Sequence, residues 1–273
     1  MRLCLPSKKL QKIPSPPLAR EGGIWYITFH QPARFCLSGA GSRLASRDPC
    51  TFWDMKTKTI VYIDGYNLYY GLLKGTKNKW LDLAKFVESL LSAEHEIVSI
   101  KYFTACTLTY PHDSAAVERQ NVYLQALLTI PGVKVIKGFF KKNRVLMPAY
   151  EESCRKCAVP RNGLVRVVKL EEKRSDVNMA VEMMVDAALS DVECLVVISG
   201  DADQVGTVEA ARWRFGKKVL VFNPQDKVSD HLKKAATYYR NIPRDLPAQC
   251  QLPDTIPYGK QGDRLIHRPP AWS

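Results

Sequence analysis

From residue 55 onward, short apolar runs alternate with segments of helical spacing, and this alternation restricts the fold more than any other feature of the chain. The apolar runs typical of buried strands occupy residues 59–64, 97–106, 133–140, 194–199 and 217–223. The segments with helical spacing occupy residues 80–93, 114–130, 176–190, 204–216 and 229–242. Strands that alternate with helices predict a mainly parallel sheet covered by helices on both faces. We therefore expect an α/β fold of three layers.

The two ends of the chain lack this alternation. Residues 1–54 are rich in Pro, Gly, Ser and Arg and have no sustained strand or helix period, so we expect a disordered extension or a segment upstream of a natural start at Met55. The alternative is a targeting peptide, because the segment is basic and poor in acids. Residues 243–273 contain many Pro and predict an extended C-terminal tail. The domain itself is expected to span residues 55–242.

The chain is strongly basic, with a formal charge of +13 over 273 residues. Such a charge favours anionic partners, and nucleic acid above all. Much of the excess lies in residues 137–174, which hold eleven Lys/Arg against four Glu. We interpret this stretch as a basic, hairpin-like insertion that binds RNA, the alternative being a merely solvated basic surface. The candidate RNA-binding residues are Lys141, Lys142, Arg144, Arg155, Lys156, Arg161 and Arg166.

Aromatic and cysteine residues lie in the same basic stretch. Phe139 is expected in the core, whereas Phe140 and Tyr150 can either belong to the core or stack on unpaired bases. Cys154 and Cys157 form a single CxxC pair, which is half of a zinc site, and no second pair or nearby His completes it. We expect free thiols there, with a structural zinc site, shared between chains, as the alternative.

The eight Cys are scattered along the chain, without the spacing of a secreted disulfide framework. This distribution indicates a reducing compartment, and we expect the cytoplasm. No apolar run approaches the roughly 18 residues that a membrane helix needs, so no membrane partner is expected. The sequence leaves homodimerisation open.

Acidic residues stand where two of the predicted strands end and where one helix begins. Asp64 ends the first strand, Asp201 and Asp203 follow the strand at 194–199, and Asp176 begins the helix after the basic stretch. Each alone can be a helix cap or a turn residue. At one sheet edge, however, these four carboxylates would repel strongly without a counter-ion. Because Mg²⁺ and Mn²⁺ take oxygen ligands, we predict that the four hold one of these ions.

Further side chains are candidates to support this site. Asn67 and Ser199 can add neutral oxygens. Asn178, Glu182 and Asp186 recur every four residues and form one polar stripe on their helix. The stripe can be a solvated face of the helix. If it instead faces the site, Glu182 is the expected extra ligand or base.

A cation held by carboxylates suits phosphodiester hydrolysis by a metal-activated water molecule. The sequence contains neither a GxxxxGK[ST] phosphate loop nor a GxGxxG motif. The five His residues lie outside the acidic motifs, so no Ser-His-Asp or Cys-His arrangement competes with this interpretation.

Three stretches, IDGYNLYYG, EEKRSDVNMAVEMMVDA and VVISGDADQVGTVEAAR, resemble in this order the NYN domain of the LabA-like, PIN-like nucleases. The resemblance covers roughly residues 57–242. It implies a PIN-like, Rossmannoid three-layer sandwich and a metal-dependent ribonuclease site. By position, it implies metal-binding and catalytic roles for Asp64, Asp176, Asp201 and Asp203.

The resemblance also implies supporting roles for Asn67, for Ser199 and for Lys173, whose ammonium group can contact a phosphate. The sequence departs from the family pattern at two positions. Glu182 stands where many relatives have Asp, which changes the reach of the carboxylate, and Gln204 stands where Phe or Leu is common.

We therefore predict a metal-dependent endoribonuclease that uses Mg²⁺ or Mn²⁺ and acts on single-stranded or structured RNA. A second hypothesis is a non-catalytic RNA-binding or nucleotide-binding module that retains the acidic pocket. A third is a metal-dependent phosphatase for a small molecule, although a small substrate does not need the basic stretch.

Overall fold

The computed structural model describes residues 18–21, 24–27, 56–106, 115–148, 163–259 and 262–273. The chain divides into two units, Met1–Thr51 and Phe52–Ser273. In the first unit, β1 (Leu18–Glu21) pairs antiparallel with β2 (Ile24–Ile27). Most of residues 1–54, and with them the predictions about a natural start or a targeting peptide, lie outside the described residues.

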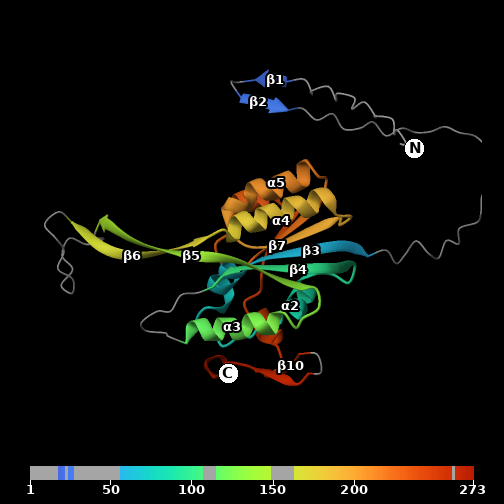
Figure 1. Cartoon of the computed structure of the whole chain (residues 1–273). Helices are drawn as coiled ribbons and strands as arrows, with labels where there is room; N and C mark the ends of the chain where they lie inside the picture. The colour runs from blue at the N-terminus through green and yellow to red at the C-terminus, as the bar shows by residue number, and fades with distance from the viewer. Residues whose placement is uncertain (1–17, 22–23, 28–55, 107–114, 149–162, 260–261) are drawn as a thin grey trace, which may run out of the picture. The chain divides into compact units, whose positions relative to one another are not determined.

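A seven-stranded sheet forms the middle layer of the second unit (Figure 1), in the spatial order β6-β5-β4-β3-β7-β8-β9. The strands are β3 (Thr57–Asp64), β4 (His95–Ala105), β5 (Val133–Pro148), β6 (Leu164–Lys173), β7 (Cys194–Ile198), β8 (Lys218–Asn223) and β9 (Tyr238–Asn241). Every neighbouring pair is parallel except β5 and β6, which are antiparallel. This topology confirms the expected α/β fold with a mainly parallel sheet.

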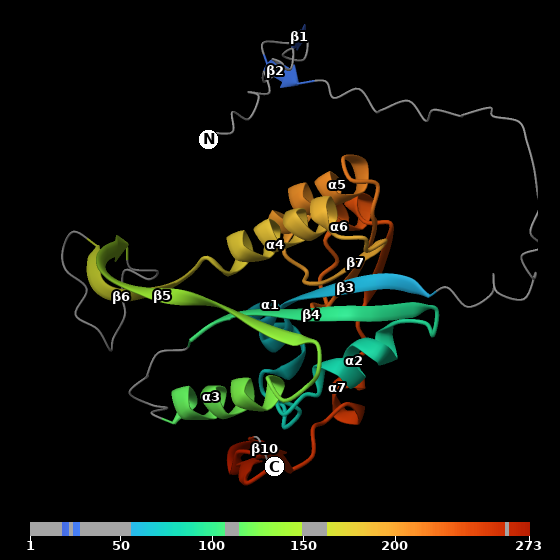
Figure 2. The same cartoon turned by 45° about the vertical axis from the view of Figure 1, so that its right-hand side comes forward.

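Helices cover both faces of the sheet, as the two views in Figure 1 and Figure 2 show. One face carries α4 (Ser175–Leu189), α5 (Val205–Trp213) and α6 (Asp230–Ala235). The other carries α1 (Gly65–Leu68), the π-helical turn η2 (Tyr69–Leu73), α2 (Leu83–Leu90), α3 (Ala116–Leu127) and α7 (Leu246–Gln249). No helix in the described part of the chain combines the length and apolar character required to cross a membrane.

Each face of the sheet has its own hydrophobic core because side chains alternate along a strand. On β3, Val61 and Ile63 pack into the core beneath α2 and α3, whereas Ile60 and Tyr62 pack into the core beneath α4 and α5. The central strands β3 and β7 are buried on both faces, which explains why they read as continuous apolar runs rather than alternating ones.

The segment expected to form the last helix, residues 229–242, divides into two elements. Helix α6 ends at Ala235, and β9 then joins the edge of the sheet parallel to β8. The backbone N–H of Thr237 donates to Val219 at 2.8 Å, and that of Ile242 donates to Asn223 at 2.9 Å. Two successive tyrosines in β9 suit a strand better than a helix.

The described residues of 243–273, namely 243–259 and 262–273, fold against the domain instead of forming the expected extended tail. After α7, β10 (Thr255–Tyr258) and β11 (Arg264–His267) form an antiparallel hairpin, followed by the turn η4 (Pro270–Trp272). Ile256 and Ile266 are buried in the core beneath α2 and α3. The indole N–H of Trp80 donates to the carbonyl of Pro253 at 2.8 Å. The C-terminal residues therefore complete this core.

The expected basic hairpin is present, and its first strand extends beyond the apolar run at residues 133–140. Strand β5 continues beyond residue 140 and pairs with β6 from Phe139↔Lys173 to Pro148↔Leu164. We call this two-stranded segment, residues 139–148 and 164–173, the arm. It projects beyond the helices in both views (Figure 1, Figure 2). Residues 149–162, which connect the two strands, lie outside the described residues.

Candidate metal centre

Three carboxylates from distant parts of the sequence meet where the parallel strands end. Asp64 is the last residue of β3, Asp176 lies in the first turn of α4, and Asp201 follows β7. One ligand oxygen from each lies within 4.8 Å of those of the other two. Metal–oxygen distances of about 2.1 to 2.5 Å make a coordination sphere about 4 to 5 Å across. The three carboxylates are therefore close enough to share one divalent cation.

Hydrogen bonds hold two of these carboxylates in place. The Asp64 carboxylate accepts the backbone N–H of Asn67 at 2.9 Å and the Ser199 hydroxyl at 3.2 Å. The Ser199 hydroxyl in turn accepts the backbone N–H of Asp201 at 3.1 Å. Ser199 thus links the ends of β3 and β7, because it bonds the carboxylate of Asp64 and the main chain of Asp201, as outer-shell residues do in metal sites.

Asn67 links three strand exits through its side-chain oxygen. This atom accepts the backbone N–H of Gly200 at 3.0 Å and the side-chain amide of Gln225, which follows β8, at 3.2 Å. Both acceptor positions of the Asn67 amide oxygen are therefore occupied by hydrogen bonds in this structure. Gln225 was not predicted, since it lies two residues beyond the strand and its type gives no metal signal.

A fourth carboxylate, that of Glu172, lies beside the first three. It belongs to a hollow of about 210 Å³ lined by Asp64, Tyr66, Asn67, Tyr70, Glu172, Asp176, Asp201 and Gln225. None of these described lining residues carries a positive charge. Arg174, with a φ of 79° in the left-handed region, turns the chain between β6 and α4, so that Glu172 and Asp176 both reach the hollow. Glu172 was not predicted as a site residue, because it lies within the basic stretch of residues 137–174.

Burial and mutual repulsion perturb the carboxylates of the hollow. Burial raises the pKa of Asp64 to about 6, and the charges of Asp176 and Glu172 add to the rise. The two hydrogen bonds to its carboxylate lower the pKa but do not offset the effect of burial. Burial also raises the pKa of Asp176, with further contributions from Asp201 and Asp203. Burial likewise raises the pKa of Glu172. A bound divalent cation would offset these effects and return the acids to their charged forms.

Comparison with known families identifies the family of this chain. The model of the NYN domain matches residues 58–243, which is more than half of the chain. The chain belongs to the NYN domain family. The expected resemblance is thereby confirmed, and the match includes Asp64, Asp176 and Asp201.

Two individual proteins are similar to this NYN domain chain. One is the Pseudomonas putida protein named 6-hydroxy-3-succinoylpyridine 3-monooxygenase HspA, 29% identical over 238 residues that cover 79% of this chain and 75% of that protein. The other is a solved structure of a Vibrio parahaemolyticus protein of unknown function, with 22% identity and a TM-score of 0.42. That alignment covers 70% of this chain and 96% of the Vibrio chain, and its likeness is too weak to bear on function.

Asp203, predicted as a fourth ligand, lies outside the group of three in this NYN domain. Its backbone N–H donates to the Asp201 carboxylate at 3.0 Å, at the start of the turn η3 (Ala202–Gln204). Its charge still reaches the site, because it contributes to the raised pKa of Asp176. Asp203 therefore acts on the centre electrostatically in this conformation.

Glu182, predicted as an extra ligand or base, is turned away from the centre. Its carboxylate accepts a hydrogen bond from the Lys101 ammonium group at 2.5 Å, and the same ammonium group donates to Asp186 at 2.6 Å. Asp186 also accepts the Tyr62 hydroxyl at 2.5 Å. The predicted polar stripe on α4 is thus neither a solvated face nor a wall of the hollow, because two of its members anchor α4 to the sheet.

The basic residues predicted to bind RNA divide into two groups. Lys141, Lys142, Arg144 and Arg166 lie on the arm, whereas Arg155, Lys156, Arg161 and the cysteines Cys154 and Cys157 lie outside the described residues. Lys173, predicted to contact a phosphate, pairs with Glu171 at 3.1 Å. Phe139, expected in the core, is 43% exposed, and the Arg174 guanidinium lies 4.9 Å from its ring centroid.

Gly200 allows the strand exits of the NYN domain to approach one another. A Cβ atom at this position would lie 2.2 Å from the side-chain oxygen of Asn223, which is too close for any side chain. Asn223 is fully buried, and its oxygen accepts the backbone N–H of Gln225 at 2.9 Å. The glycine of the SGDAD stretch is therefore required for packing at the site.

Proposed function

We propose that this NYN domain cleaves RNA endonucleolytically by hydrolysis, with Mg²⁺ or Mn²⁺ held by Asp64, Asp176 and Asp201. The observation that supports this most strongly is the convergence of the three carboxylates, within 4.8 Å of one another. The described lining of their hollow lacks any cationic side chain that would neutralise them. Membership of a nuclease-like family supports the same chemistry.

The residues of the hollow suit this reaction. A divalent cation bound there supplies a Lewis acid for the phosphoryl group and activates water as the nucleophile. Ser199 already holds the Asp64 carboxylate and the main chain of Asp201 in place. Glu172, whose pKa is raised by burial, is suited to take up a proton during the reaction. Tyr70, 56% exposed, offers a ring on which a nucleotide base can stack.

A second candidate function comes from the Pseudomonas relative, whose name describes oxygenation of a pyridine. A pyridine ring can stack on Tyr66 or Tyr70 as a nucleobase can. The ligand set argues for the first proposal, because the described hollow offers carboxylates and no His. Carboxylate oxygens favour Mg²⁺ or Mn²⁺, whereas non-haem iron oxygenases typically use two His and one carboxylate.

The partner in this proposal is RNA, and the compartment is the cytoplasm. The exposed cationic side chains of the arm, including Arg144 and Arg166, support RNA as the partner. The free thiols of Cys106, Cys194 and Cys250 support a cytoplasmic location, because unpaired cysteines are typical of a reducing compartment.

The decisive experiment is cleavage of an end-labelled single-stranded RNA with Mn²⁺ or Mg²⁺, comparing wild type with Asp201→Asn. Cleavage should fall more than about 100-fold, since loss of outer-shell partners alone costs about 10-fold to 100-fold. Asp191→Asn is the matched control and should retain activity. Asp191 lies before β7, pairs with Lys58, and has a side chain that is 77% exposed.

Three results would contradict the proposal. Equal cleavage by wild type and Asp201→Asn would indicate a contaminating nuclease. RNA binding without cleavage by wild type would favour the non-catalytic module. Oxygen consumption with 6-hydroxy-3-succinoylpyridine and a nicotinamide or flavin reductant, in the absence of RNA cleavage, would favour the monooxygenase.

A further inference from the structure

We infer that one face of the arm is a binding track that guides a single-stranded polynucleotide into the acidic hollow. The inference rests on the proposed function. It adds that the substrate is single-stranded. It also names the arm residues that bind this substrate at a distance from the bond that is cut.

The strand register assigns each arm residue to one of two faces. Directly opposed residues of an antiparallel pair share a face, and successive residues alternate between faces. The face that we call the site face comprises the pairs Phe140↔Glu172, Lys142↔Leu170, Arg144↔Val168 and Leu146↔Arg166. The face that we call the far face comprises the pairs Phe139↔Lys173, Lys141↔Glu171, Asn143↔Lys169 and Val145↔Val167.

The site face is continuous with the hollow. Glu172 lines the hollow, and its partner Phe140 packs edge-to-face against Tyr66, another lining residue, with ring centroids 5.7 Å apart. Leu146 and Arg166 lie six residues farther along the arm, which is about 20 Å at roughly 3.3 Å per residue. The site face therefore runs from the carboxylates of the hollow to the outer end of the arm and turns with the twist of the two strands.

The cations on the two faces differ in their partners. On the far face, Lys169 and Lys173 both pair with Glu171, at 2.5 and 3.1 Å. On the site face, Lys142, Arg144 and Arg166 form no ion pair with any described residue, so their charges are available to phosphates. Lys141 is also unpaired among the described residues, but it lies on the far face. The inference therefore removes Lys141 from the predicted RNA contacts.

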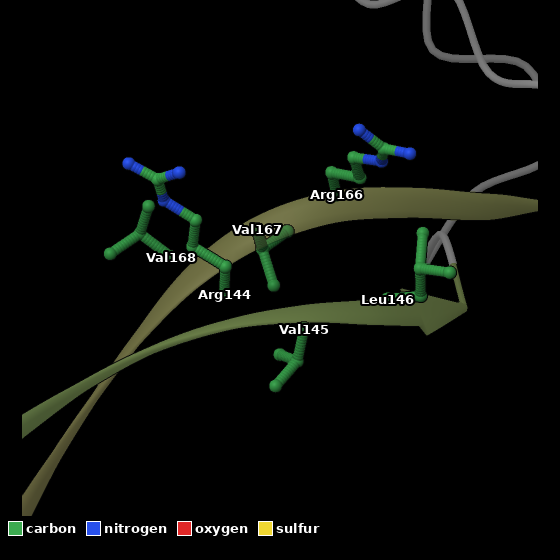
Figure 3. A pocket seen from close by; sticks show the side chains of 6 residues that line it. All are labelled: Arg144, Val145, Leu146, Arg166, Val167 and Val168. Atoms are coloured by element: carbon green, nitrogen blue, oxygen red, sulfur yellow. The ribbon is translucent and has the colours of Figure 1, made fainter.

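Exposed apolar side chains separate the cations on the site face. Figure 3 shows Arg144, Leu146, Arg166 and Val168 on one side of the ribbon and Val145 on the other. Leu146 is 59% and Val168 is 54% exposed. Both line a hollow of about 330 Å³ with the two arginines and with Val145 and Val167 of the far face. This alternation suits an unpaired strand, whose bases offer apolar faces beside the phosphates. A duplex hides its bases and would leave these side chains without a partner.

Two double variants of the full-length protein test the track. Arg144→Ala/Arg166→Ala removes two charges from the site face, and Lys141→Ala/Lys169→Ala removes two from the far face. Affinity for a labelled 12-nucleotide single-stranded RNA is measured without divalent metal, over a range of salt concentrations. The site-face variant should bind at least tenfold more weakly. Its log–log salt slope should fall by about 1.4, at about 0.7 for each lost phosphate contact, whereas the far-face variant should match wild type.

Equal losses in both variants would overturn the track, since the arm would then act as an unspecific cationic surface. Equally tight binding of a 12-base-pair duplex would overturn the assignment to single strands. Cleavage of a dinucleotide, too short to reach Arg144, should be unchanged in the site-face variant. If wild type cleaves no RNA while the predicted binding difference holds, the proposed hydrolysis fails and the track stands.

Discussion

Asp64 illustrates a conflict between function and stability at the scale of a single residue. Asp64 is 8% exposed, and burial raises the pKa of its carboxyl group to about 6. An unfolded chain would give it a pKa of about 3.9. Since the folded state binds this proton more tightly, the associated stability is present below about pH 4 and is lost as the pH rises through about 6. At neutral pH, the metal-free protein therefore contains a destabilising charge.

We predict that Asp64→Asn stabilises the metal-free protein at pH 7.5, by up to about 3 kcal/mol for a pKa difference of about two units. The gain should disappear near pH 4, where Asp64 is already protonated. Urea denaturation at several pH values measures it. Mg²⁺ should stabilise wild type and leave the variant unchanged, because only wild type retains the full ligand set. A variant less stable than wild type at pH 7.5 would contradict this account.

At the scale of elements, α4 has two tasks that lie at different positions along its length. Its first turn carries Asp176 into the hollow, while its later turns are tied to β4 through Lys101. The Lys101 side chain is only 7% exposed, so its pairing with Glu182 and Asp186 compensates a charge placed inside the domain. This anchor holds the helix whose N-terminus positions one of the three acids.

We predict that Glu182→Gln leaves the affinity for Mn²⁺ within about twofold of wild type. It should lower the free energy of unfolding by about 1 kcal/mol, because a neutral amide replaces a half-exposed partner of Lys101. Lys101→Met should cost about 3 kcal/mol, since it removes the cation that neutralises the Glu182 and Asp186 carboxylates. Calorimetric titration and thermal unfolding measure the two quantities. A tenfold loss of metal affinity in Glu182→Gln at unchanged stability would show that Glu182 is a ligand.

At the scale of the second unit as a whole, the C-terminal residues close the core beneath α2 and α3. Leu252, Ile256 and Ile266 are each at most 9% exposed. The ring of Trp272 lies 6.3 Å from that of Trp80, which is completely buried. This core also packs against α1 and η2, which carry the lining residues Tyr66, Asn67 and Tyr70, so its loss would affect the hollow through these turns as well as through the sheet.

We predict that removing residues 252–273 prevents stable folding. Three buried aliphatic side chains contribute about 4.5 to 9 kcal/mol, at about 1.5 to 3 kcal/mol each, against a typical domain stability of about 5 to 15 kcal/mol. The milder Trp272→Ala should lower the stability by about 2 kcal/mol and retain RNA cleavage, because Trp272 is only partly buried. Thermal unfolding measures both. An unchanged melting temperature in the truncated protein would contradict a role in the core.

The sequence alone determined the layered α/β fold and the acids at the strand exits. Parallel strands require crossovers, and they bring their carboxyl ends to one edge, so the sequence predicts that Asp64 and Asp201 meet there. The distance between them along the chain does not matter, because the topology places β3 and β7 side by side.

Only the tertiary structure decided which side chains complete and support that edge. Glu172 reaches the hollow because the antiparallel arm returns beside β5, and a shift of one residue in register would turn it to the far face. Glu182 points to Lys101 because α4 packs across β4, and the C-terminal residues fold inward because they cover Trp80. These outcomes depend on register and on contacts between layers, which local patterns of residue type do not encode.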